Sequence, residues 1–298
     1  MTAYVGRYAP TPSGPLHLGS LLAATASYVD ARAHGGAWLL RIDDLDAART
    51  VAGASEDIIA TLRRFGFEWD GDILYQSQRH GAHAKAIASL LATGRAFRCA
   101  CTRREQSGGP EGLEGPIYPG TCRRGMPAGR RARSTRLCVA DVSVACPDAI
   151  QGRYTQRLAR DVGDFVLGRV EGHAAYQLAT VVDDAWQGVT HVVRGADLLS
   201  SAPRQMYLAE MLDLAAPVYA HIPVLVDDQG RKLSKSTGAL GLADDALGPQ
   251  LVRCLSLLGQ RPLATLACRT PAAILRWAID HWSREAVPRL DALIVPQG

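Results

Sequence analysis

The N-terminal part of the chain alternates between apolar runs and turn-forming stretches. Residues 5–9 form a short β-prone run, and the Pro/Gly-rich stretch 10–15 follows it. Apolar residues then recur at helical spacing over 18–34, until Gly35 and Gly36 end the pattern. Residues 37–42 form a second apolar run. The order of strand, glycine loop, helix and strand predicts a βαβ unit whose strands lie parallel.

The second apolar run ends in acidic residues, Asp43, Asp44 and Asp46. In an open parallel sheet, ligands bind at the carboxyl ends of the strands. We therefore expect the polar residues that follow both runs to face a ligand.

The pattern changes over residues 98–136, where glycines, cysteines and arginines are dense. An ordinary core strand cannot carry so many arginines, so this stretch is interpreted as part of an insertion. Apolar strand-like segments return at 176–182, 189–194 and 222–226, and a helical tail is expected from residue 249 onwards. The predicted parts are the first half of an α/β domain (1–97), an insertion (98–160), the second half (161–245) and a helical C-terminal region (246–298).

Size and composition exclude several classes of protein. A chain of 298 residues with 47% apolar residues can bury one or two cores, which excludes disorder and disulfide miniproteins. No apolar run is long enough to span a membrane, and Gly6, Arg7 and Pro10 interrupt any signal peptide. We therefore expect a cytoplasmic protein, and we also expect it to be a monomer. Its seven cysteines favour reduced thiols or a metal site over a disulfide framework.

The choice of basic residues is more informative than the net charge of +4, which only weakly supports a polyanionic partner. The chain has 30 arginines and only 3 lysines, and two of the lysines, Lys232 and Lys235, lie in one pentapeptide. Because arginine serves elsewhere as the general cation, these lysines are expected to contact phosphate. A compact ammonium group on a flexible stem suits that task.

Two motifs carry candidate nucleotide chemistry. Residues 7–20 read Arg-Tyr-Ala-Pro-Thr-Pro-Ser-Gly-Pro-Leu-His-Leu-Gly-Ser, which places His17 and Gly19 where a helix begins after a strand. Such a helix start offers free amides to phosphate groups. Residues 232–236 read Lys-Leu-Ser-Lys-Ser. Taken singly, the first motif is equally consistent with a capped helix start, and the second with a solvated basic loop.

In this order and separation, the two motifs resemble the signatures of the class I aminoacyl-tRNA synthetases. These are a His-x-Gly-His-like element, here ending in Ser20, and a Lys-Met-Ser-Lys-Ser-like loop, here with Leu233. Residues 41–46, 182–184 and 187–197 resemble the glutamyl branch of that family. The resemblance implies a Rossmann-like α/β catalytic domain with a parallel sheet.

The resemblance also implies a glutamate pocket. Glutamate carries two carboxylates and an ammonium group, so its pocket needs guanidinium clamps and an acid. The matching positions give Arg7 and Arg194 as clamps, Asp43 as the acid, and Thr11 and Tyr176 as neutral hydrogen-bonding residues. The family usually has glutamate at the position of Asp43, so this carboxylate lies one methylene nearer the backbone.

The implied reaction is ATP-dependent formation of glutamyl-adenylate. His17, Gly19 and Ser20 are expected to hold ATP, and Lys232 and Lys235 to reach the departing pyrophosphate. Mg²⁺ would accompany ATP, bound mainly through phosphate and water. The protein then acts by positioning reactants and neutralising charge, without a nucleophilic side chain.

Three cysteines in the insertion have a spacing that is typical of zinc ligands. Cys99 and Cys101 are two residues apart, and Cys122 follows in a glycine-rich segment. The resemblance implies Tyr118 as the fourth ligand, with Cys138 as the alternative. One structural zinc per chain is expected, because no general base accompanies the ligands. The remaining cysteines are expected to be small buried side chains: Cys146, Cys254 and Cys268.

The region after the lysine loop is short. It has about sixty residues, whereas anticodon-binding domains need on the order of 100, so none is expected. The shortened relatives with this cysteine pattern are the glutamyl-queuosine tRNA(Asp) synthetases. This resemblance implies transfer of glutamate to queuosine, with the tRNA(Asp) anticodon stem-loop as partner.

Three other functions are consistent with parts of the sequence. A shortened glutamyl-tRNA synthetase would charge a tRNA 3′ end with the same adenylate residues. A small-molecule amino-acid ligase would need no RNA. A zinc-stabilised RNA-binding module would lack catalysis and would use the arginines at 123, 124, 130, 131, 133 and 136.

Overall fold

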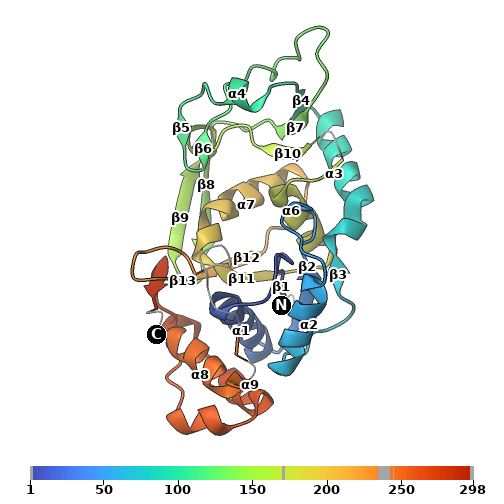
Figure 1. The fold of residues 1–298 in the computed structure, drawn as a ribbon. Coiled ribbons are helices and arrows are strands. Elements are labelled where there is room, and N and C mark those ends of the chain that lie inside the picture. The colour runs from blue at the N-terminus through green and yellow to red at the C-terminus, as the bar shows by residue number, and fades with distance from the viewer. Residues whose placement is uncertain (1–2, 170–171, 234–241, 244, 296–298) are drawn as a thin grey trace.

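The computed structural model describes residues 3–169, 172–233, 242–243 and 245–295, so the predicted phosphate ligand Lys235 lies outside the described residues. Figure 1 shows an elongated molecule with an α/β domain in the middle. A group of short strands lies at one end of this domain, and the helices α8 (Leu247–Leu257) and α9 (Pro271–Asp280) lie at the other.

The first half of the α/β domain is the predicted βαβ unit. Gly36 permits the tight return from helix to strand, since a Cβ at this position would lie 2.5 Å from the Tyr4 carbonyl oxygen. All three strands of this half are parallel, which confirms the predicted pairing. The elements are β1 (Val5–Tyr8), α1 (Leu18–Ala33), β2 (Ala37–Ile42), α2 (Ala54–Arg64) and β3 (Leu74–Tyr75).

The second half joins the first at the edge of β1. Thr190 donates its backbone N–H to the Val5 carbonyl at 2.9 Å, and its Oγ1 accepts from the Val5 N–H at 2.9 Å. This seam sets β11 (His191–Gly195), which begins at the next residue, beside β1. The elements are α6 (Tyr176–Trp186), β11 (His191–Gly195), η2 (Ala196–Ser201), α7 (Ala202–Met211) and β12 (Val218–Ile222).

Residues 176–182 form part of helix α6, so the predicted strand there is wrong. The segment has only seven residues, most of them apolar, and periodicity over so short a run does not separate a buried strand from a buried helix. Leu178, Val181 and Val182 pack into an apolar core, while Asp183 and Asp184 are buried with polar partners. Residues 178–184 are all buried, apolar and polar alike, so the helical period becomes visible only over the full helix.

The segment predicted as an insertion has two different attachments. β4, β7 and β10 form an antiparallel sheet at the end of the molecule, whereas β8 and β9 form a hairpin that extends the main sheet, with Asp148 opposite Tyr219. The elements between residues 76 and 169, which include the predicted insertion, are η1 (Gln76–Arg79), α3 (His80–Ala92), β4 (Ala96–Cys99), α4 (Arg103–Gln106), β5 (Glu111–Gly112), β6 (Gly115–Pro116), β7 (Ser134–Leu137), β8 (Ser143–Asp148), β9 (Gly152–Arg157), α5 (Leu158–Asp161) and β10 (Val166–Arg169).

The C-terminal region is helical, as expected, but it ends in a strand that the sequence analysis missed. β14 (Ala292–Ile294) pairs in parallel with β13 (Val224–Val226), just before the lysine loop. A three-residue strand offers too few positions for an alternating pattern. The remaining elements are the short helices η4 (Ala264–Cys268) and η5 (Arg284–Ala286).

Apolar side chains form separate clusters. The largest joins α1, β2, α2, α8 and α9, and a second joins α3, α6 and α7 with the antiparallel sheet. A third, small cluster surrounds the cysteines of the insertion. Among the helices in the described part of the chain, none has the length and apolar content needed to cross a membrane.

Asp30 ties the C-terminal region to α1. Its side chain is buried, and it accepts hydrogen bonds from Trp282 Nε1 at 2.8 Å, from Arg284 Nη2 at 2.7 Å and from the Tyr4 hydroxyl. Although burial would raise the pKa of Asp30, Arg284 and the other donors hold it below the ordinary value. The carboxylate therefore stabilises the packing of the C-terminal segment.

We expect Asp30→Ala to lower the free energy of unfolding by about 2–4 kcal/mol, because buried donors would lose their charged acceptor. Since the pKa of Asp30 is lowered by folding, this contribution is present above the ordinary aspartate pKa of about 3.9 and is lost as the pH falls below it. Urea unfolding at neutral and acidic pH measures both effects. The exposed Asp141, paired with Arg157, provides the control, and Asp141→Ala should change stability little. Equal losses for both variants would contradict the prediction.

Candidate active site

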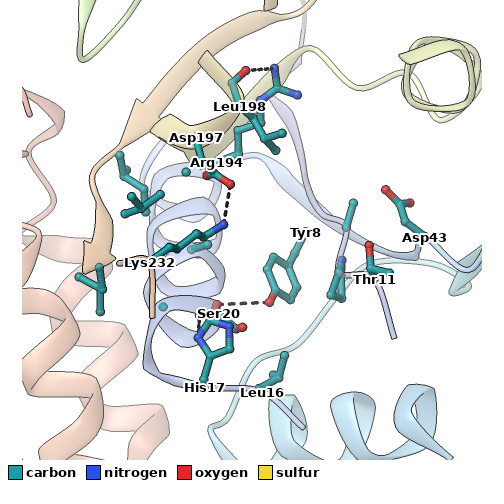
Figure 2. Close-up of a pocket in the computed structure, with 18 of the residues that line it drawn as sticks. Tyr8, Thr11, Leu16, His17, Ser20, Asp43, Arg194, Asp197, Leu198 and Lys232 are labelled. Atoms are coloured by element: carbon teal, nitrogen blue, oxygen red, sulfur yellow. Dashed lines mark hydrogen bonds and ion pairs between the residues drawn. The ribbon is translucent and has the colours of Figure 1, made fainter. Parts of the chain in front are cut away.

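A cavity of about 770 Å³ opens where the two halves of the α/β domain meet (Figure 2). It lies at the carboxyl ends of β1, β2 and β11, as the strand pattern predicted. Every predicted glutamate or ATP residue within the described ranges lines it. These residues are Arg7, Thr11, His17, Gly19, Ser20, Asp43, Tyr176, Arg194 and Lys232.

Arg194 is a buried arginine held from behind by three acceptors. Its Nε donates to His221 Nε2 at 2.9 Å, its Nη1 to Gln205 Oε1 at 2.9 Å and its Nη2 to the Leu198 carbonyl at 3.2 Å. A guanidinium group has five N–H donors, so one N–H remains on each terminal nitrogen. Two parallel donors are what a carboxylate needs for bidentate binding.

Arg7 belongs to a second buried charge network. Its Nε donates to Asp184 at 3.3 Å, and the same oxygen accepts from Arg41 Nη1 at 2.5 Å. Burial would raise the pKa of Asp184, but Arg7 and Arg41 hold it below the ordinary value. Asp184 therefore stays charged and fixes Arg7 at the wall of the cavity.

Asp43 lines the cavity near Thr11, and its carboxylate also accepts from Arg41 Nε at 2.8 Å. Burial raises the pKa of the Asp43 carboxyl, although Arg41 opposes this effect. A cation bound in the cavity would favour the charged form of this carboxyl. The position is thus suited to an ammonium group.

The start of α1 supplies the phosphate side of the cavity. His17 is the N-cap, and its Nδ1 accepts from the Ser20 N–H at 3.3 Å. Gly19 leaves room for the imidazole, since a Cβ there would lie 3.1 Å from His17 Cε1 and press on the ring. Free amides at a helix start, beside an imidazole, form an anion site.

Lys232 points toward Asp197, the second residue after β11. Its Nζ lies 2.6 Å from Asp197 Oδ2, and both side chains are partly exposed (Figure 2). An exposed pair of this kind is weak, so a phosphate group could replace Asp197 at low cost. Asp197 is a lining residue that the sequence analysis did not assign, although it ends the 187–197 motif.

Comparison with known proteins identifies the family. The model for "tRNA synthetases class I (E and Q), catalytic domain" matches residues 4–262. The chain belongs to this family. The glutamyl-Q tRNA(Asp) synthetase of Dechloromonas aromatica is 51% identical over 296 residues, 98% of each chain. That of Thiobacillus denitrificans is 51% identical over 287 residues, 96% of this chain and 95% of its own.

The fold of the synthetase also has a solved counterpart. A glutamate tRNA ligase from Elizabethkingia meningosepticum, crystallised in complex with its amino acid, superimposes with a TM-score of 0.81 at 23% identity. The match covers 98% of this chain and 67% of that one. It supports the predicted α/β class I architecture, at the level of the fold.

A second cavity of about 480 Å³ adjoins the first in this synthetase. The two share the lining residues Thr11, Asp43, Arg49 and Tyr176, so they meet at the predicted glutamate residues. The second cavity extends toward η1 and β10, on the side of the antiparallel sheet. Its further polar lining residues are Asp46, Gln76, Arg169 and His173.

The three predicted cysteine ligands meet in a buried cluster. The sulfur atoms of Cys99, Cys101 and Cys122 lie within 4.8 Å of one another, and those of Cys101 and Cys122 are 3.7 Å apart. Tetrahedral zinc with Zn–S bonds of about 2.3 Å requires sulfurs about 3.8 Å apart. Although burial opposes ionisation, hydrogen bonds with Tyr118 and the Cys101 amide lower the pKa of Cys99 to about 7. The cluster is therefore compatible with zinc.

The Tyr118 hydroxyl lies beside this cluster and accepts a hydrogen bond from the Cys122 N–H at 2.8 Å. Its oxygen lies 3.4 Å from Cys99 Sγ and 3.5 Å from Cys101 Sγ. Cys138 packs against the cluster but does not join the group of candidate ligand atoms found among the described residues. The geometry thus favours Tyr118 over Cys138. Of the three other cysteines, Cys146 and Cys254 are buried as expected, whereas Cys268 is exposed, which corrects that prediction.

The arginines of the insertion do not all face solvent. Arg136 is buried, with its guanidinium 4.1 Å from the centroid of the Tyr118 ring. Arg123 and Arg130 pair with carboxylates at 2.9 and 2.8 Å. Within the described residues 98–136, the exposed arginines for which no acidic partner is found are Arg98, Arg103, Arg104, Arg124, Arg131 and Arg133.

Sequence reasoning missed the residues that support the pocket from behind. Arg41 and Asp184 lie in segments that were quoted for their family resemblance, so a signal existed. Gln205 and His221 lie in no motif. Only their contacts with Arg194 connect them with the pocket.

Proposed function

We propose that this chain activates glutamate with ATP and transfers the glutamyl group to queuosine in the anticodon of tRNA(Asp). The observation that carries the proposal is the buried guanidinium group of Arg194. It lines the same cavity as Arg7, Asp43 and the start of helix α1 at His17. The names of the relatives, which share half of their residues with this chain along nearly its whole length, support the acceptor.

In the proposed complex, one carboxylate of glutamate binds the two free N–H groups of Arg194, and the ammonium group binds Asp43. Arg7, which lines the cavity together with Asp43, then neutralises the negative charge of a substrate carboxylate. The glutamate α-carboxylate attacks the α-phosphorus of ATP, and the bond to pyrophosphate breaks. The reactants are held in place by the pocket, which is how such sites lower the barrier.

His17 and the amides at the start of α1 are proposed to hold the phosphate oxygens. Lys232 would release Asp197 and bind the departing pyrophosphate. Lys235 would bind the pyrophosphate as well. Mg²⁺ bound to ATP supplies further charge neutralisation. These contacts strengthen as charge develops on the leaving group, so they act on the rate more than on glutamate affinity.

We propose that the second cavity receives the acceptor base. A hydroxyl group of that base would attack the glutamyl carbonyl carbon, and AMP would leave. The approach is open because the cavity meets the first one at Thr11 and Tyr176. The exposed, unpaired arginines of the insertion then lie on the side from which RNA phosphates would arrive.

Cys99, Cys101, Cys122 and Tyr118 are proposed to hold one structural zinc. The metal would fix the insertion against the catalytic domain. We further propose that the chain acts as a monomer in the four parts given above, since all groups assigned to the reaction come from one chain.

The first test is ATP–pyrophosphate exchange across the amino acids with no RNA present. Glutamate alone should support exchange, because every assigned pocket residue belongs to the amino-acid or ATP site. Exchange that requires RNA would contradict this part of the proposal. If none of the amino acids supported exchange, with or without RNA, the non-catalytic RNA-binding module would be the remaining alternative.

The second test concerns the acceptor. A tRNA(Asp) anticodon stem-loop with queuosine should accept glutamate, whereas the same loop with guanosine should not. Transfer should weaken with rising salt, because phosphate contacts release counterions. Removal of the 3′-terminal nucleotides from full tRNA(Asp) should leave transfer intact. Loss of transfer on that removal would identify a shortened glutamyl-tRNA synthetase instead.

A further inference from the structure

Behind Arg194 lies a chain of hydrogen bonds that ends outside the pocket. Arg194 lies on β11, His221 lies on the adjacent β12, and Asp148 lies at the end of β8. We propose that Asp148 and His221 are positioning residues that hold Arg194 ready for a carboxylate by keeping His221 in one neutral tautomer. This inference rests on the proposed function, because it takes Arg194 as the glutamate ligand.

The geometry fixes the proton positions along these hydrogen bonds. Arg194 Nε lies 2.9 Å from His221 Nε2, and a guanidinium nitrogen can only donate. His221 Nε2 is therefore the acceptor and carries no proton. The imidazole proton then lies on Nδ1, which donates to Asp148 Oδ2 at 2.6 Å. One tautomer alone satisfies both neighbours.

Asp148 is itself fixed by the backbone. Its Oδ1 accepts from the N–H groups of His221 at 3.1 Å, Ile150 at 3.0 Å and Gln151 at 2.8 Å. The side chains of Asp148 and His221 are both fully inaccessible to solvent. The carboxylate thus has one oxygen committed to the turn after β8 and one committed to the imidazole.

The surroundings keep His221 neutral. Burial lowers the pKa of His221, the Arg194 charge adds to this effect, and Asp148 and the nearby Asp197 oppose it. The ring of Tyr219 stacks beside the imidazole, with the two centroids 6.0 Å apart. A charged imidazole would point an N–H at Arg194 Nε, which would remove the acceptor and place two cations in contact.

Asp148→Asn provides a sharp test because the amide has one allowed orientation. Three backbone N–H groups require an acceptor at the Oδ1 position, so the asparagine NH₂ must face His221 Nδ1. That nitrogen would then have to accept, which moves the imidazole proton to Nε2 and against Arg194. A Ser-His-Asp triad responds in the same way to this substitution, by adopting the wrong tautomer.

The experiment measures ATP–pyrophosphate exchange against glutamate concentration for full-length variants. We expect Asp148→Asn and His221→Leu to raise the KM for glutamate roughly 10- to 100-fold, with kcat within about threefold of the parent. His221→Gln, whose side-chain oxygen can take the place of Nε2, should restore most of the affinity. His281→Leu, at an exposed histidine in contact with Trp277, is the matched control and should leave KM unchanged.

A second readout separates positioning from a merely structural role. Nitrogen-15 NMR of the histidines should find His221 protonated at Nδ1 in the parent and at Nε2 in Asp148→Asn. A variant that only folds poorly would lower the active fraction, and with it the apparent kcat, without changing KM. An unchanged KM in Asp148→Asn and His221→Leu, or an imidazolium in the parent near neutral pH, would overturn the inference. If the parent fails to activate glutamate, the proposed function fails instead.

Discussion

Arg194→Leu is expected to lower kcat/KM for glutamate activation by about 100- to 1,000-fold. The substitution removes a buried guanidinium that three acceptors hold in place and that keeps one N–H on each terminal nitrogen for the substrate. It also leaves a substrate carboxylate without its buried partner, a loss worth about 3–5 kcal/mol. Arg194→Lys keeps the charge but not the fork, so an intermediate loss is expected.

ATP–pyrophosphate exchange at several glutamate concentrations measures this effect. Arg157→Leu is the matched control, because Arg157 is exposed and pairs with Asp141 away from the cavity. The control should remain within about twofold of the parent. If Arg194→Leu also remained within that range, Arg194 would not be a glutamate ligand.

Replacement of Cys99 and Cys101 with serine is expected to abolish zinc binding, of which the native chain should hold one ion. Structural zinc contributes on the order of 10 kcal/mol to the folding of small zinc domains. The effect should stay local, since the cysteine cluster packs separately from the two larger apolar cores. The insertion should therefore become sensitive to protease, and transfer to the stem-loop should be lost while exchange persists.

Metal analysis, limited proteolysis and the two activity assays distinguish these outcomes. Cys268→Ser provides the matched control, because Cys268 is exposed and lies outside the cluster. A native chain without zinc would refute the metal site. Loss of exchange together with transfer would show that the insertion supports the whole catalytic domain and not only the RNA side.

The sequence by itself determined the elements that depend on local patterns. The apolar runs and glycines predicted β1, α1 and β2 because the period of a strand or helix is set by neighbouring residues. The spacing of Cys99 and Cys101 likewise predicted a cluster that the fold brings together with Cys122. Family motifs, read in order, gave the residues that line the cavity.

Only the tertiary structure decided the placement of segments that have little local pattern. Helix α6 was mistaken for a strand because the stretch read from the sequence, residues 176–182, is too short to show the helical period of the full helix. β14 is too short to predict, and it exists because β13 offers it a free edge. In both cases, the neighbouring elements determine the structure of the segment.

The residues that support Arg194, His221 and Asp148, could not be predicted from the sequence either. His221 lies 27 residues from Arg194, and Asp148 lies 73 residues from His221, on strands that become neighbours only in the folded sheet. A histidine in a strand and an aspartate at a turn are common, and no spacing connects them. Buried polar groups need partners, but which groups become partners depends on strand order and register, and these are properties of the whole fold.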